Sequence, residues 1–363
     1  MEKARHDRLW TKLSFDRRQP PRRLEPAWVA NPMNDRTAYA LHAILNDHYE
    51  MGRILRFRQI RKGTQAECFE LLTAEQNEFL LFLYPSDFSR RALCDAAPVM
   101  DRLASGGFPV SRPVASRDGD TAGRNVYAIE GPQGSHFFVT TLAPGQMVTA
   151  ADWSSHDLSN LGLRLGWLHR TMRDAFNADT AAAGENLSPA RRQAPVLRLT
   201  AALENASPRG QQLRQMLSAA AVDRLLTDLE KLEKLPNSAF GYVHGAISPE
   251  AVLLDHDRHI ASVVDWGNFS IGLPAQDVID AFVHWCVHKD GEVRAEAAQA
   301  LLQAYISLEK FRGDQWHSVV IAWCAHRLSS ALSGRTHLPR GFGSILENPH
   351  SLSATLTICQ SKL

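Results

Sequence analysis

The chain has 363 residues, of which 44% are hydrophobic and 22% charged, and its formal net charge is +1. These values are typical of a globular protein large enough for two lobes, and a charge near zero gives no general attraction for nucleic acid. No apolar run approaches the roughly 20 residues that span a bilayer, and the N-terminus is too polar for a signal peptide. We therefore expect a cytoplasmic protein with neither a membrane nor a nucleic-acid partner. The five cysteines contain no C-x-x-C pair, which favours reduced thiols over a disulfide or zinc framework.

Residues 1–34 differ in composition from the rest of the chain. They mix arginines with four prolines and show no sustained hydrophobic period. We expect a flexible or loosely docked arm here. Two alternatives remain open: a solvated tail, or a docking arm that packs on the body or on a partner through Trp10, Leu13, Phe15 and Trp28.

Residues 35–142 have the pattern of a helix followed by an antiparallel meander. Apolar residues recur at helical spacing up to Tyr49, and strands are expected at 54–60, 68–72, 79–84, 126–129 and 136–142, with a helix at 90–104. The turn from Lys62 to Glu67 contains one glycine, Gly63. An ordinary hairpin and a loop that cradles phosphates are both open for this turn. Ala143-Pro144-Gly145 then breaks the chain and predicts a hinge.

Residues 143–335 are mostly helical in pattern. A helix at 158–172 carries an apolar stripe, and we expect its His169 to be a packed, hydrogen-bonded histidine. Residues 174–210 are expected to form a loose insertion. Further helices are expected at 213–235, 278–289, 293–308 and 314–332, with His284, Trp285 and His288 in the core or at its rim. Residues 336–363 have two prolines and two glycines in their first half and predict an irregular C-terminal tail.

The stretch GYVHGAISPEAVLLDHDRHIASVVDWGNFSIGLPAQD, residues 241–277, is the most informative part of the chain. A polar turn from His244 to Glu250 precedes two short strands, and the second strand ends at Asp265. This layout resembles the catalytic and metal-binding segments of the aminoglycoside phosphotransferase, choline kinase and homoserine kinase family. In that family HGD is followed five residues later by Asn, and then by I-D-[WF]. The matching positions here are His244, Gly245, Ser248, Pro249, Asp265, Gly272, Pro274 and Asp277.

The resemblance implies an α+β, protein-kinase-like fold with a small antiparallel-sheet N-lobe at 35–142 and a larger, mostly helical C-lobe at 143–335. It also exposes departures from the family. Ala246 stands where the family has the Asp that orients the acceptor hydroxyl, and Ala251 where it has a magnesium-binding Asn. Phe82 occupies the position of the strand lysine or arginine, and Ala96 that of its usual glutamate partner. Replacing both members of a buried ion pair by apolar groups is often neutral, whereas replacing one is costly.

By the same resemblance we assign the remaining site residues. His244, Ser248, Glu250 and Asp265 are the candidate catalytic positions, with Asp265 also the metal ligand. Candidate nucleotide-binding positions are Gly63, Phe82, Thr140, Leu142, Leu253 and Val264, where the backbone near 140–142 meets an adenine edge or serves only as a hinge.

Two functional hypotheses follow. The missing residues favour a degenerate kinase that binds ATP and Mg²⁺ weakly or not at all and serves as a binding or regulatory protein for an unknown small molecule or protein. The alternative is an active small-molecule kinase whose Asp265 holds one metal and whose Ser248 or Glu250 faces the acceptor. No dense acidic cluster favours a polycationic acceptor, and no motif supports hydride transfer or metal-dependent hydrolysis.

Overall fold

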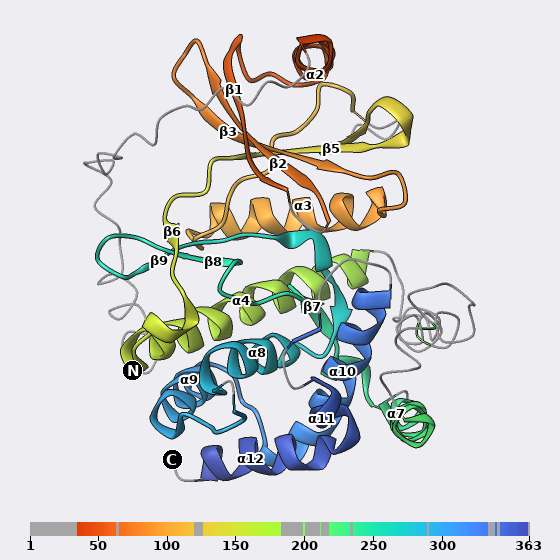
Figure 1. Cartoon of the computed structure of the whole chain (residues 1–363), viewed down its shortest axis with the longest axis vertical. Coiled ribbons are helices and arrows are strands. Elements are labelled where there is room, and N and C mark those ends of the chain that lie inside the picture. Colours follow the sequence, from red (N-terminus) through yellow and green to blue (C-terminus); the bar gives the residue numbers. More distant parts are fainter. Residues whose placement is uncertain are drawn as a thin grey trace.

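The computed structural model describes residues 35–62, 65–119, 126–182, 199, 211, 218–232, 235–288, 290–332, 338–339 and 342–361. The described elements form two lobes, a sheet-containing upper lobe and a helical lower lobe (Figure 1). The predicted arm at 1–34 and the candidate Gly63 lie outside the described residues. Within the described ranges, no helix combines the length and the apolar character needed to cross a bilayer.

The upper lobe is built on a five-stranded antiparallel sheet in the order β1-β2-β3-β5-β4. The sheet follows helix α2 (Asp35–His48), and the strands are β1 (Ile54–Lys62), β2 (Glu67–Thr73), β3 (Glu78–Tyr84), β4 (Ala128–Glu130) and β5 (His136–Thr141). Because side chains alternate along a strand, Phe69 and Leu71 face the small core shared with α2, whereas Cys68 and its cross-strand partner Phe82 face the other way. Helix α3 (Arg90–Ser105) lies between the sheet and the lower lobe (Figure 1).

The lower lobe is organised around a close pair of helices, α4 (Ser155–Ala182) and α9 (Ala295–Leu308). Gly162 permits this approach, because a Cβ there would lie 2.2 Å from the Leu301 carbonyl oxygen. Around the pair are α7 (Ala219–Leu232), α8 (Gln276–Ala281), a π-helical turn (Phe282–Cys286), α10 (Trp316–Leu332), α11 (Phe342–Glu347) and α12 (Pro349–Ser361).

Five short strands place the segment 241–277 between the lobes. Strand β7 (Gly241–Val243) pairs with β10 (Ser270–Gly272), and β8 (Val252–Leu254) lies between β6 (Gln146–Met147) and β9 (Ile260–Val263). The amide of Val263 donates to the Pro109 carbonyl at 2.8 Å, which joins β9 to the chain that follows α3. The segment is therefore fixed from both lobes.

Two of our expectations about the chain are wrong. Residues 174–182, expected in a loose insertion, continue helix α4. Residues 342–361, expected to be irregular, form α11 and α12, and α12 packs on α10 and α9. Serines and threonines, which are weak helix formers, make up five of the 13 residues of α12. Tertiary burial of Leu352, Leu356 and Cys359 on one face outweighs this weak propensity.

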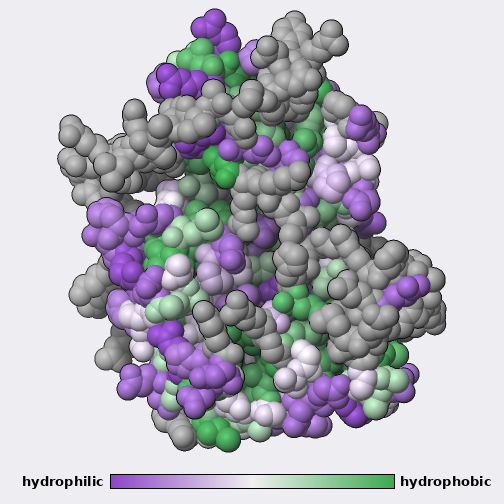
Figure 2. All heavy atoms as spheres, viewed as in Figure 1, coloured by the Kyte–Doolittle hydropathy of each residue, from purple (hydrophilic) through white to green (hydrophobic). Residues whose placement is uncertain are grey.

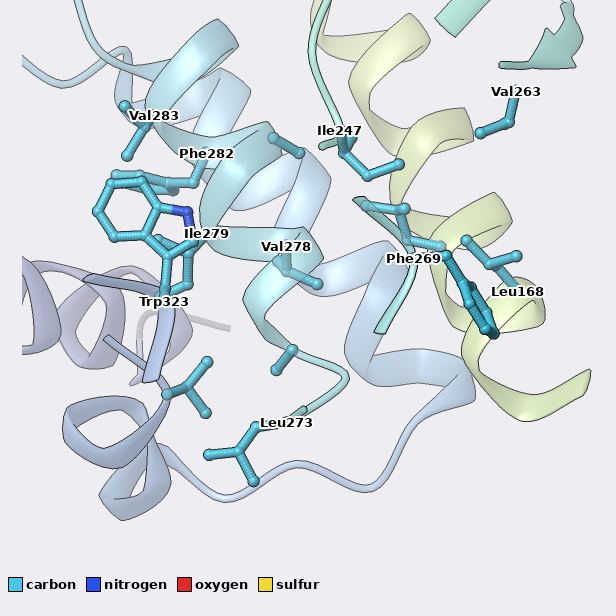
Figure 3. Close-up of a cluster of buried hydrophobic side chains, with 14 of the residues drawn as sticks. Leu168, Ile247, Val263, Phe269, Leu273, Val278, Ile279, Phe282, Val283 and Trp323 are labelled. Atoms are coloured by element: carbon cyan, nitrogen blue, oxygen red, sulfur yellow. The ribbon is translucent and has the colours of Figure 1, made fainter. Parts of the chain in front are cut away.

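A single large core joins the lower lobe to α3. Figure 3 shows part of it, where Leu168 of α4, Ile247 of the turn after β7, Val278 of α8 and Trp323 of α10 lie in one cluster. On the surface, hydrophilic and hydrophobic residues are interspersed over the face drawn in Figure 2.

Candidate functional site

One buried carboxylate, Asp277 of α8, accepts hydrogen bonds from the backbone of the turn after β7. The amide of His244 donates to Asp277 Oδ2 and the amide of Gly245 to Oδ1, both at 2.8 Å. Gly245 has φ +78°, and a Cβ there would lie 2.6 Å from the Asn268 carbonyl oxygen. A side chain at 245 is therefore strained by both backbone conformation and space. The result is a turn with a fixed backbone at the start of the candidate site.

A second buried chain of hydrogen bonds supports Asp277. His169 Nε2 of α4 lies 3.1 Å from Asp277 Oδ2, and the Tyr305 hydroxyl of α9 lies 3.0 Å from His169 Nδ1. Burial raises the pKa of Asp277, but the hydrogen bonds from His169 and from the Gly245 amide outweigh burial and leave the pKa below its usual value. Asp277 therefore stays ionised, and His169 is the packed, hydrogen-bonded histidine expected from the sequence.

His244 holds the turn against the strand that delivers Asp265. Its Nε2 donates to the Val264 carbonyl at 2.9 Å, and its Nδ1 accepts from the Ala246 amide at 3.3 Å. Both bonds suit a neutral ring, and burial lowers the pKa of His244, although nearby Asp277 and Asp265 oppose this. With both nitrogens engaged in backbone contacts, His244 is placed to position the loop.

Ala246 and Ala251, the two departures from the family pattern, both lie in the turn between β7 and β8. Ala246 is 4% exposed and Ala251 is fully buried. The turn is closed by the Ala251 amide, which donates to the Ser248 carbonyl at 2.9 Å, and the Val264 amide donates to the Ala251 carbonyl at 2.8 Å. Ser248 is half-buried and Glu250 exposed. A methyl group can neither accept a proton nor bind a metal, so the turn offers neither function at 246 or 251.

Asp265 follows β9 in a left-handed conformation, with φ +67°. The side chain is exposed and lines a pocket between the lobes. Among the described residues, no group of three or more His, Cys, Asp or Glu side chains is arranged to hold a metal ion. Magnesium held by one protein carboxylate relies on substrate phosphates and water for its other ligands. A metal bound through Asp265, the predicted ligand, would therefore take its remaining ligands from outside the described residues.

The walls of this pocket are mainly apolar. They come from β3, β5, α3 and the Asp265 turn, and the apolar and aromatic members are Phe82, Tyr84, Leu93, Ala96, Met100 and Phe138, with Val264 and Trp266. The ring centroid of Phe82 lies 6.4 Å from those of both Tyr84 and Phe138. Ala96 is 1% exposed and faces this aromatic group from α3. The predicted strand and helix positions, Phe82 and Ala96, thus meet in one pocket.

The remaining predicted nucleotide positions are divided between the pocket and the backbone around it. Thr140 and Val264 line the pocket, whereas Leu142 and Leu253 lie outside its lining. The Thr141 amide donates to the Arg112 carbonyl and the Leu142 amide to the Glu78 carbonyl, at 2.8 and 3.0 Å. Both amides already donate hydrogen bonds to backbone carbonyls. An adenine edge would therefore have to hydrogen-bond with other backbone groups of the hinge.

Two polar residues near the Asp265 turn and the pocket were missed by the sequence analysis. Ser111 lines the pocket, is 5% exposed, and its hydroxyl has no hydrogen-bond partner among the described residues. Gln65, at the end of the β1–β2 turn, lies on the Asp265 turn, because a Cβ added to Gly267 would lie 2.3 Å from Gln65 Oε1. Neither residue belongs to a local motif, and only the folded chain brings them to the site.

Comparison with known proteins agrees with this architecture. The phosphotransferase enzyme family model matches residues 56–312, well over half of the chain. The homoserine kinase of Pseudomonas aeruginosa is 26% identical over 285 residues, which cover 76% of this chain and 80% of that protein.

Two solved structures share the fold. An amicoumacin kinase, solved in complex with AMP-PNP, Ca²⁺ and amicoumacin, has a TM-score of 0.55 at 15% identity and covers 90% of this chain and 96% of its own. The Plasmodium vivax ethanolamine kinase has a TM-score of 0.55 at 11% identity, with 85% and 84% covered. The chain belongs to the phosphotransferase enzyme family and has its protein-kinase-like fold.

Proposed function

We propose that this chain is a degenerate member of the phosphotransferase family that acts as a binding or regulatory protein rather than as a kinase. The observation that carries the proposal is the chemistry of four positions. Phe82, Ala96, Ala246 and Ala251 stand where family members place the phosphate-binding cation, its carboxylate partner, the hydroxyl-orienting Asp and the second metal ligand. Phosphoryl transfer depends almost entirely on such positioning and charge.

The packing at Phe82 and Ala96 supports the proposal. A lone charge at either position would be desolvated among aromatic and aliphatic side chains, at a cost of several kcal/mol. Phe82 instead packs with Tyr84 and Phe138, and Ala96 is buried on α3. The apolar side chains at these two positions therefore pack without leaving a buried charge unpaired.

A kinase with relocated chemistry is the second candidate, and Asp265 is the observation that favours it. The carboxylate is exposed in the cleft and would reach a metal carried by a nucleotide. Ser248 or Glu250 of the turn would then face the acceptor hydroxyl. In this case the acceptor is a small-molecule alcohol, the substrate class that the name homoserine kinase indicates for the relatives.

A thermal-shift titration with ATP, run with Mg²⁺ and with EDTA, separates the candidates. A ligand at 100 times its Kd stabilises a folded protein by about 2.7 kcal/mol. We predict that any stabilisation by ATP depends only weakly on Mg²⁺, because Asp265 is the one recognisable ligand and the metal would take its other ligands from the phosphates and water. Asp265→Ala should then behave as the wild type, as should Asp257→Ala on an exposed turn. Micromolar ATP affinity that collapses on chelation, and in Asp265→Ala alone, would contradict the proposal.

A further inference from the structure

Two histidines of the lower lobe stack on each other where α10 meets α12. The ring centroids of His317 and His350 are 4.1 Å apart, and the ring planes differ by 4°. His317 is the second residue of α10 and His350 the second residue of α12. The pair therefore joins α10 to α12, which lies at the end of the lower lobe away from the sheet (Figure 1).

The surroundings of His317 suit a neutral ring. Its Nδ1 is buried without a hydrogen-bond partner among the described residues, whereas its Nε2 lies 3.8 Å from Asp228 Oδ2 of α7. A neutral ring with its proton on Nε2 faces the carboxylate and leaves no buried donor unpaired. Protonation adds an N–H group at Nδ1, and a buried donor without an acceptor costs free energy.

The charges around His317 give a cationic ring little compensation. Asp228 already pairs with Lys231 of the same helix, whose Nζ lies 2.6 Å from Asp228 Oδ1. Glu347, at the end of α11 just before α12, pairs with Arg224 of α7 at 3.2 Å. His317 thus faces one carboxylate, one ammonium group and the stacked partner ring.

Both rings also lie in the first turn of a helix. The unsatisfied N–H groups there give this end of a helix a partial positive charge, which disfavours a cation. Burial and the stacked His350 ring lower the pKa of His317, against the attraction of Asp228. In acid, two cationic rings 4.1 Å apart would repel each other at the point where α12 meets α10.

We infer that the His317–His350 stack is a pH-sensitive contact that docks α12 on α10 at neutral pH and loosens it below about pH 6. Loosening α12 uncovers the apolar surface of α9 and α10 on which Leu352, Leu356 and Cys359 are buried. The inference goes beyond the proposed function, because neither histidine lines the cleft. The contact would act in the same way in a kinase and in a binding protein.

Hydrogen exchange of the full chain, measured by mass spectrometry between pH 7.5 and 5.5, tests the inference. Each rate is divided by the intrinsic exchange rate at that pH. Peptides of α12 are then compared with peptides of α4, which report any change in the stability of the whole fold. We expect the opening constant of α12 to rise about 10-fold more than that of α4, the effect of one proton taken up over about one pH unit.

Two variants locate the effect. His317→Phe keeps a stacked aromatic ring but has no titrating nitrogen, so the ratio of the α12 change to the α4 change should fall to about 1. His256→Gln, which alters an exposed histidine of the β8–β9 turn, should keep the wild-type ratio. If His317→Phe does not fold by circular dichroism, His350→Phe takes its place and should at least halve the ratio.

Two results would overturn the inference. A ratio of about 1 in the wild type would show that α12 stays docked in acid. A ratio that keeps its wild-type value in His317→Phe, or in His350→Phe where that variant is used, would place the pH dependence elsewhere in the molecule.

Discussion

At the scale of single residues, Asp277 is the side chain whose hydrogen bonds fix the backbone of the turn after β7. It accepts from two backbone amides and from His169 while fully buried. Asp277→Asn would replace one accepting oxygen by a donor that faces an amide donor. Buried groups left unsatisfied cost about 1–3 kcal/mol each. We predict a loss of about 3 kcal/mol or more in the free energy of unfolding, measured by urea denaturation.

Two controls accompany the Asp277 measurement. Tyr305→Phe removes only the outer hydrogen bond of the same chain and should cost about 1 kcal/mol. Asp257→Asn, on an exposed turn, should change stability by less than about 0.5 kcal/mol. A loss of the same size in Asp257→Asn and Asp277→Asn would show that Asp277 does not hold the turn.

The pH dependence of stability follows from His244. In the unfolded chain this ring takes up a proton below its ordinary pKa of about 6.5, whereas burial lowers the pKa of His244 in the folded protein. The unfolded state thus binds more protons below pH 6.5, and the free energy of unfolding falls as the pH falls. Burial also lowers the pKa of His284 and of His317, and this adds to the fall in the free energy of unfolding at low pH.

Urea denaturation between pH 7.5 and 5 measures this slope. Each histidine that stays neutral in the fold contributes up to about 1.4 kcal/mol per pH unit. His244→Gln keeps a side-chain donor without a titrating ring, so its slope should be smaller than that of the wild type. Equal slopes in wild type and His244→Gln would refute the assignment of a buried neutral ring.

At the scale of elements, α12 tests whether the C-terminal residues belong to the core. Leu356 is fully buried, whereas Ile358, two residues later, is 53% exposed. We predict that Leu356→Ala lowers the free energy of unfolding by about 2–5 kcal/mol, as for other buried leucines. Ile358→Ala should cost less than about 0.5 kcal/mol. Comparable small effects for both would mean that α12 docks weakly, and their melting temperatures give an independent check.

The helices and strands also show which parts of the fold the sequence patterns predicted and which they missed. An apolar run bounded by turn residues predicted the strand that carries Phe82, and the spacing from His244 to Asp277 identified the family, because turn and strand patterns are local. Helix α12 was missed although Leu352, Leu356 and Cys359 recur at helical spacing, because serines and threonines stand between them and the prolines and glycines before them favour a loop. The length of α4 was missed because its last residues, DAFNADTAA, were grouped with the polar stretch after them, although alanine favours a helix.

At the scale of the whole molecule, elements of both lobes are needed to form the site. Phe82 comes from β3, Ala96 from α3, Ser111 from the chain after α3, and Asp265 from the segment that returns about 150 residues later. A resemblance in sequence identified the first two and the last of these positions. Ser111 required the structure, because nothing local marks a serine whose hydroxyl meets a pocket made by distant elements.

The central claim, that this family member lacks kinase chemistry, is tested most directly by ATP turnover of the purified wild-type chain with Mg²⁺, with Ala246→Val and Asp265→Ala measured beside it. The account predicts that all three release phosphate at the rate of the protein-free blank, because Ala246 and Ala251 supply neither the hydroxyl-orienting carboxylate nor the second metal ligand of the family pattern. Turnover well above the blank that survives in Ala246→Val and vanishes in Asp265→Ala would contradict the account, and would show that the chemistry has moved to Asp265 and its neighbours.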